Sequence, residues 1–160
     1  MKKIVLGFLL GLIAGQLLGQ DVKSDSTYCD FSNLHSVNDM LLKKKLGDHQ
    51  LPEQNPKYEG GLEGLKSFFG ENSLADIRAQ SIVFRVHIGF VVNCRGEAKG
   101  FEIISEGKGD LKDLGEQVLK VAKQIPGKWT PASAKGHNVD CNQVLSFTVA
   151  SGKLDKLTYR

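Results

Sequence analysis

Proline, cysteine and excess charge are all scarce in this chain of 160 residues. It has four prolines, no internal repeat and no low-complexity tract. The formal net charge is +3, and it falls to +1 when residues 1–20, with two lysines and no acid, are set aside. A nearly neutral chain offers no electrostatic basis for binding nucleic acid or an anionic membrane. The composition, 41% apolar and 24% charged, is typical of one globular domain with short appendages.

The sequence also lacks the short motifs that mark common enzyme classes. It contains no HExxH, no GxSxG and no phosphate-binding glycine-rich loop. The four histidines are scattered, and His137 lies four residues before Cys141 in what reads as a loop entering a strand. A closed metal site needs about four ligands, so we expect no metal, no cofactor and no small-molecule substrate.

The one long apolar run lies at the N-terminus. Lys2 and Lys3 precede Ile4–Gly19, a run of about 16 residues that is shorter than the about 20 residues of a membrane-spanning helix. A positive start before a short apolar stretch is typical of a secretory signal peptide. We expect residues 1–20 to be cleaved, with a mature start at Asp21 and a periplasmic or secreted protein. An uncleaved N-terminal membrane anchor is the alternative.

A long hairpin at Ser81–Ile104 dominates the rest of the chain. Every second position is apolar, and side chains in a strand alternate between faces, so one face of the first strand is apolar; the set is Ile82, Phe84, Val86, Ile88, Phe90 and Val92. The opposite face, from Val83 to Asn93, is mixed and partly solvated. Cys94–Glu97 contains the glycine of a hairpin turn, and a second strand follows at Ala98–Ser105.

Two amphipathic helices can cover this apolar face. Leu62, Leu65, Phe68 and Phe69 predict a helix that starts at Gly60–Gly61 and ends near Gly70. A clearer apolar stripe runs through Leu111–Ile125, with Asp110 as the expected N-cap.

Two further strands are predicted at Gln143–Ala150 and Leu154–Tyr159. The sequence therefore predicts an α+β fold, a two-layer sandwich in which an antiparallel sheet of three to four strands packs on two helices. We expect residues 21–56 to be a polar N-terminal segment and linker, with a short helix within Ser36–Leu46, and residues 57–160 to be the domain.

Several stretches, taken in order, resemble the C-terminal domain of TonB, the energy-transducer family of Gram-negative envelopes. They are Tyr58–Leu62 with its Gly-Gly pair, Phe90–Asn93 with Gly96, Phe101–Ile104, Trp129-Thr130-Pro131-Ala132 with Gly136, and Val144–Phe147. The chain has too few prolines for the long Pro-rich spacer of a transducing TonB. The resemblance therefore implies a fold and a protein-binding tendency rather than energy transduction.

The resemblance implies binding by β-augmentation, in which a partner's extended peptide joins the edge of a sheet. The partner would be a protein or an extended peptide, such as that of an outer-membrane transporter. A homodimer, in which the partner is a second copy of the chain, is an alternative. The matching edge is the closing strand, namely Val144, Leu145, Ser146, Phe147, Thr148 and Val149. We expect Trp129, Pro131 and Gly136 to be structural, with Trp129 in the core.

In the family the first and closing strands are antiparallel neighbours, which implies a disulfide between Cys94 and Cys141 and leaves Cys29 unpaired. Leu154–Tyr159 follows a two-residue turn, so we expect it to fold back and cover the closing strand's edge. The function that competes with a non-enzymatic binding module is an exported hydrolase or metal-dependent enzyme. It would use His87, His137, Asp140 or Cys141.

Overall fold

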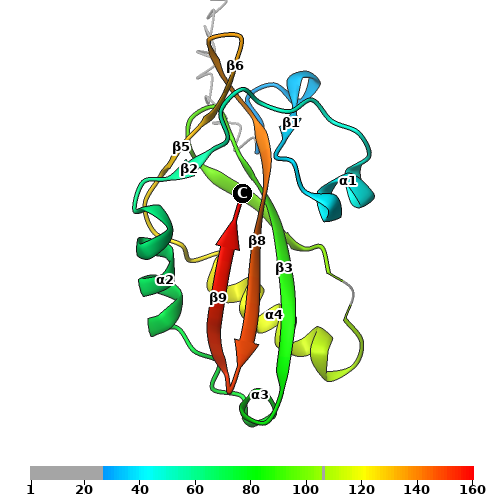
Figure 1. Ribbon diagram of the computed structural model, residues 1–160, viewed down its shortest axis with the longest axis vertical. Helices are drawn as coiled ribbons and strands as arrows, with labels where there is room; N and C mark the ends of the chain where they lie inside the picture. Colours follow the sequence, from blue (N-terminus) through cyan, green and yellow to red (C-terminus); the bar gives the residue numbers. More distant parts are fainter. Residues whose placement is uncertain (1–26, 106) are drawn as a thin grey trace, which may run out of the picture.

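The computed structural model describes residues 27–105 and 107–160 (Figure 1). The expected signal peptide or membrane anchor, residues 1–20, lies outside the described residues. Among the residues that are described, no helix is long and apolar enough to cross a membrane.

A five-stranded sheet organises the molecule. In it β8 lies between β3 on one side and both β1 and β9 on the other, and β4 pairs with the far side of β3. All pairings are antiparallel except that of β1 with β8, so the sheet is mixed and has one strand more than expected. The strands are β1 (His35–Ser36), β3 (Val83–Val92), β4 (Ala98–Ile103), β8 (Cys141–Ala150) and β9 (Lys153–Tyr159).

The helices and the shorter strands surround this sheet. The helices are α1 (Met40–Leu46), α2 (Gly61–Glu71), α3 (Ile77–Gln80) and α4 (Asp110–Ala122), with a 3-10 turn η1 (Phe31–Asn33). Two small ladders pair β2 (Lys57–Tyr58) with β5 (Trp129–Thr130), and β6 (Ala132–Ala134) with β7 (His137–Val139). The chain thus has the mixed helix and sheet content expected of an α+β protein.

The main core lies between the sheet and the helices. Helix α4 runs across the rear of the sheet and α2 packs beside β9 (Figure 1). The apolar set of β3 meets Leu65 and Phe69 of α2 and Leu114 and Val118 of α4, all fully buried. Burial of each such side chain is worth about 1.5–3 kcal/mol. Asp110, which was expected to be the N-cap of α4, is instead its first residue. The N-cap is Gly109, which makes no side-chain hydrogen bond to the helix.

Trp129 occupies the core, as expected. It is 2% exposed, and its ring centroid lies 5.2 Å from that of Phe90 and 5.4 Å from that of Tyr58. Pro131 separates β5 from β6, and Gly136 has φ +75° in the turn of the β6–β7 hairpin. Gly96 has φ +77°, and a Cβ there would lie 2.1 Å from the carbonyl oxygen of Trp129, so this turn needs glycine.

The polar segment expected as a linker at residues 21–56 is, in its described part, attached to the sheet. Strand β1 pairs with Cys141 and Asn142 of β8, and Asp39 caps α1 by accepting hydrogen bonds from two backbone N–H groups. Val37 and Leu42 are both 2% exposed in a second apolar cluster with Val144. Val37 and Leu42 therefore bury against one end of the sheet, whereas Met40 and Leu51 of the same segment are exposed.

Candidate functional site

The closing strand, where the family resemblance placed a partner-binding edge, is interior to the sheet. Strand β8 pairs with β3 along its whole length, from Val83↔Ala150 to Val92↔Cys141. Its other side pairs with β9 from Leu145 to Ala150. The stretch Val144–Val149 therefore has no free edge, because the C-terminal hairpin folds back as expected and covers it.

The outer strands β9 and β4 are interrupted. The pairing of β9 shifts register between Ser146 and Thr148, and Lys156 has a positive φ of +44°. The pairing of β4 shifts between Gly89 and Val91, and Gly100 has φ +66°. Bulges and charges of this kind protect edges against strand addition.

Strand β3 has a regular edge that nothing among the described residues occupies. Strand β4 pairs with β3 only from Ile88 onward. His87 then receives the backbone N–H of Ile104 on its carbonyl and donates its own N–H to the Ser105 hydroxyl. The backbone N–H and C=O groups of successive residues point to opposite sides of a strand. Those of Val83 and Arg85 therefore point the same way as those of His87, away from β8. Two N–H and two C=O groups thus face outward over Val83–Val86, which we call the open half of β3.

A groove of about 420 Å³ runs beside the open half of β3 and is bounded by α4. Its apolar lining comes from Val86 and Ile103 of the sheet and from Leu111 of the helix, and Gly115 lies between them. Its charged lining is Arg85, Lys108, Lys112 and Glu116.

Helix α4, the groove's wall, is held by a polar network from α3. Arg78 binds Asp76 at 2.8 Å and also contacts Asp110 and Asp113 in the first turn of α4. Gln117 donates to Asp76. The hydrogen bonds from Arg78 and then from Gln117 hold the pKa of Asp76 well below its usual range.

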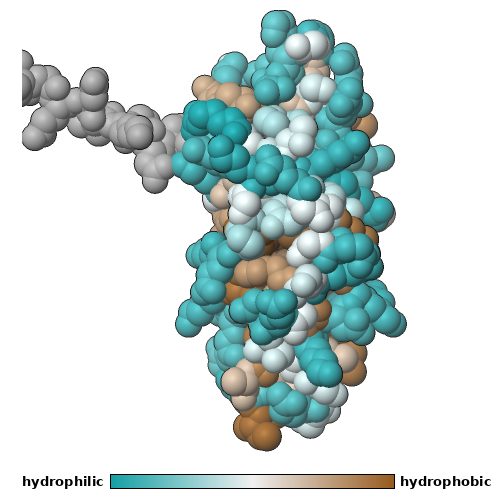
Figure 2. Space-filling model, turned by 90° about the vertical axis from the view of Figure 1, so that its left-hand side faces the viewer, coloured by the Kyte–Doolittle hydropathy of each residue, from teal (hydrophilic) through white to brown (hydrophobic). Residues whose placement is uncertain are grey.

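The end of the molecule beside this groove exposes apolar side chains. Ile77 of α3 is 80% exposed and Val83 is 72% exposed. Figure 2 shows the side with α2 as mainly hydrophilic, with a hydrophobic tip at the end where α3 lies in Figure 1. The beginning of β3 is therefore an apolar and open part of the surface.

The residues of the enzyme alternative do not meet in one site. His137 is exposed on the β6–β7 hairpin, whereas Asp140 and Cys141 are buried. Burial raises the pKa of the Cys141 thiol to about 12, so it is a poor nucleophile at neutral pH. His87 Nδ1 lies 2.8 Å from the Ser146 hydroxyl, a contact between neighbouring strands.

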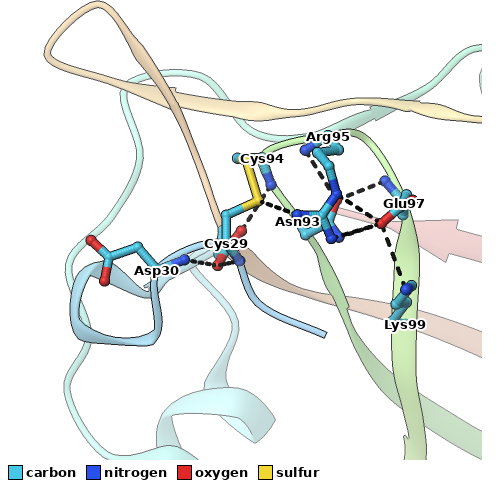
Figure 3. Close-up of a disulfide and its surroundings, with 8 residues drawn as sticks. Cys29, Asp30, Asn93, Cys94, Arg95, Glu97 and Lys99 are labelled. Carbon is cyan, nitrogen blue, oxygen red and sulfur yellow. Dashed lines mark hydrogen bonds and ion pairs between the residues drawn. A yellow bond between two sulfur atoms is a disulfide. The ribbon is translucent and has the colours of Figure 1, made fainter. Parts of the chain in front are cut away.

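The disulfide links Cys29 to Cys94, so the pairing of Cys94 with Cys141 was wrong. The two Cα atoms are 6.0 Å apart, and Cys141 is a free buried thiol. Cys141 pairs in register with Val92 and its side chain lies in the second apolar cluster with Val37. Cys94 lies in the turn beyond β3, where the N-terminal segment passes (Figure 3).

One buried carboxylate organises both ends of this disulfide. Asp140 is 2% exposed, and its Oδ2 accepts the N–H groups of Cys29 at 2.6 Å and Asp30 at 2.9 Å. Its Oδ1 accepts the N–H of Cys94 at 2.8 Å. Three such bonds compensate a charge whose burial is otherwise costly. Asp140, proposed from sequence as a catalytic or metal-ligating group, therefore has a structural role.

The turn that carries Cys94 is itself held by polar contacts. Asn93 and Arg95 both donate to Glu97, and these hydrogen bonds, that from Asn93 first, lower the pKa of the Glu97 carboxyl (Figure 3). The disulfide end of β3 is thus fixed by a cross-link and several polar contacts that its open half does not have.

The open half of β3 was missed at the sequence level, although one signal pointed to it. The first strand of the hairpin has a longer apolar pattern than the second, so part of it lacks a partner in the hairpin.

Comparison with known family models found no match, and comparisons with curated proteins and with solved structures found none either.

Proposed function

We propose that this protein is an exported, non-enzymatic protein-binding module that takes up an extended segment of a partner along the open half of β3. The observation that carries the proposal is the pair of outward N–H and C=O sets on Val83 and Arg85, beside a groove of about 420 Å³. A peptide that adds a strand to such an edge gains backbone hydrogen bonds, and its alternate side chains gain a pocket.

The direction of the bound segment follows from the sheet. The bound segment would continue the line of β4, antiparallel to β3, beyond the contacts that Ile104 and Ser105 make with His87. At about 3.4 Å per residue, four residues of β3 offer an edge of roughly 14 Å. Four or five partner residues suffice to fill it.

The proposal includes a relation to the TonB C-terminal domain and to its two-layer sandwich of sheet and helices. It keeps sheet-edge binding and moves it from the closing strand to the first strand of the hairpin. The partner would be an envelope protein with an extended segment, such as an outer-membrane transporter, in the periplasm or outside the cell.

The test is selection of random heptapeptides from a display library on the protein, followed by affinity measurement with Val83→Pro. Val83 is the first residue of β3 and its N–H faces outward, a position where a sheet tolerates proline. Loss of one hydrogen bond and the intruding ring should weaken the selected peptides by roughly tenfold.

Val83→Ala is the matched control, because it trims the same side chain and keeps the N–H. We expect it to bind the peptides nearly as the parent does, with the same near-ultraviolet circular dichroism for all three proteins. Peptides that bind the proline variant and the parent equally would refute this edge as the site.

A further inference from the structure

We infer that the segment bound at the open half of β3 carries acidic side chains among apolar ones. This inference rests on the proposed function and specifies its ligand. In a strand added to β3, alternate side chains face opposite sides of the sheet. One set would point toward α4, where Leu111 and Lys112 line the groove, and the other toward the face that carries Val83 and Arg85. Each side therefore offers an apolar and a cationic side chain.

Both sides of the added strand would meet apolar surface. Toward α4, Leu111 is 44% exposed and lines the groove with the partly buried Ile103. A Cβ on Gly115 would lie 3.3 Å from Ile103 Cδ1 and 3.8 Å from Val86 Cγ2, so this glycine lets α4 pack closely on the sheet. On the other face Val83 is 72% exposed. Apolar side chains of a partner can therefore pack on Leu111 or on Val83.

The charges of the groove select acidic partners. Among the described residues, Arg85, Lys108 and Lys112 line the groove with no ion pair, against the single acid Glu116. The acids nearest on α4, Asp110 and Asp113, are engaged by Arg78. The positive charges at the groove are therefore left to attract carboxylates of a ligand, an attraction that salt screens.

Two other occupants fit less well. A nucleic acid would bring its phosphates to a groove that also presents Ile103 and Leu111, in a chain that is nearly neutral overall. A second copy of this chain would bring its own outer strands β4 and β9, whose pairings are interrupted by register shifts and by the positive φ of Gly100 and Lys156. Such interruptions disfavour strand addition.

Three synthetic heptapeptides test the inference by fluorescence anisotropy. They alternate valine with glutamate, with glutamine or with lysine on the same flexible tail. We expect the glutamate peptide to bind about three- to tenfold more tightly than the glutamine peptide, and the lysine peptide most weakly. The difference should shrink between about 50 and 500 mM salt, as the Debye length shortens.

Lys112→Glu and Lys120→Glu form a matched pair, because both reverse an exposed charge on α4 and only Lys112 lines the groove. We expect Lys112→Glu to weaken the glutamate peptide by about threefold or more and Lys120→Glu to leave it nearly unchanged.

The outcomes separate this inference from the proposed function. Equal binding of the glutamate and glutamine peptides, both lost in Val83→Pro, would overturn the acidic preference and leave the edge as a binding site. Binding of all peptides that is unaffected by Val83→Pro would overturn the proposed function itself. A dimer of the protein that Val83→Pro dissociates would also overturn the inference, because the occupant would then be a second copy.

Discussion

The two halves of β3 are alike in sequence pattern and different in surroundings. Ile88–Val92 pairs with β8 on one side and with β4 on the other, and both Ile88 and Val92 are fully buried. In the open half, Phe84 and Val86 are buried toward the helices, while Val83 is 72% exposed. One strand therefore provides the centre of the core and, a few residues earlier, an unpaired edge.

The half of β3 that is paired on both sides, Ile88–Val92, has additional supports that the open half lacks. Beyond Val92 the chain enters the turn that holds Cys94, Asp140 binds the N–H groups of both disulfide cysteines, and the N-terminal segment covers the second face. Stability is thus concentrated at one end of the strand, which leaves the other end available for recognition.

The largest effect is expected from Ile88→Ala. Ile88 is 0% exposed, so the substitution should cost about 2–5 kcal/mol in the free energy of unfolding through lost burial and a cavity. Val83→Ala, in the same strand, should stay within about 0.5 kcal/mol because its side chain is exposed. Urea denaturation of both variants measures the difference, and equal losses would refute the division.

Removal of the disulfide should have the next largest effect. Cys29→Ala with Cys94→Ala opens a link between residues 65 apart in sequence, which typically costs about 2–4 kcal/mol. Binding at the open half should be retained below the lowered unfolding temperature. Thermal unfolding together with peptide affinity checks both statements.

The same account predicts the chemistry of the cysteines. A non-reducing peptide map should link Cys29 to Cys94. Because burial raises the pKa of Cys141 to about 12, iodoacetamide at neutral pH should modify Cys141 only after denaturation. A map that joins Cys141 to either partner would contradict the observed pairing.

The smallest effect concerns His87, at the boundary between the halves. Burial, and then the charge of Arg85, lower its pKa, while Asp39 opposes them. The unfolded chain therefore takes up the proton first as pH falls below 6.5, so stability should decline between that value and the lower folded pKa. His87→Asn should flatten this part of the pH profile of the unfolding free energy. An unchanged slope would assign it to another group.

The sequence predicted what local periodicity controls. The alternation of β3 and the stripe of α4 each bury one face against the other, so both elements lie close to their expected bounds. The two-residue turn between two strands predicted the return of β9 onto β8. The size of Trp129 predicted its burial in the core.

What the sequence could not predict depends on contacts between distant residues. Strand β1 has two residues and no periodicity, and its pairing with Cys141 places the N-terminal segment on the sheet. That placement brings Cys29 to Cys94. The register of β3 with β8 alone would equally have favoured Cys141 as the partner of Cys94, because Cys141 lies opposite Val92. The partners of Asp140 are 110 and 46 residues away, so no local pattern could reveal them.

Amide hydrogen exchange along β3, measured by NMR with and without the alternating valine–glutamate heptapeptide, would show whether Val83–Val86 is an unpaired edge that binds a peptide. In the free protein we expect rapid exchange at Val83 and Arg85 and slow exchange at Phe84 and Val86, whose N–H groups face β8. Added peptide should protect Val83 and Arg85 and leave Phe84 and Val86 unchanged. Slow exchange at all four amides in the free protein, or no protection when peptide is bound, would contradict the account.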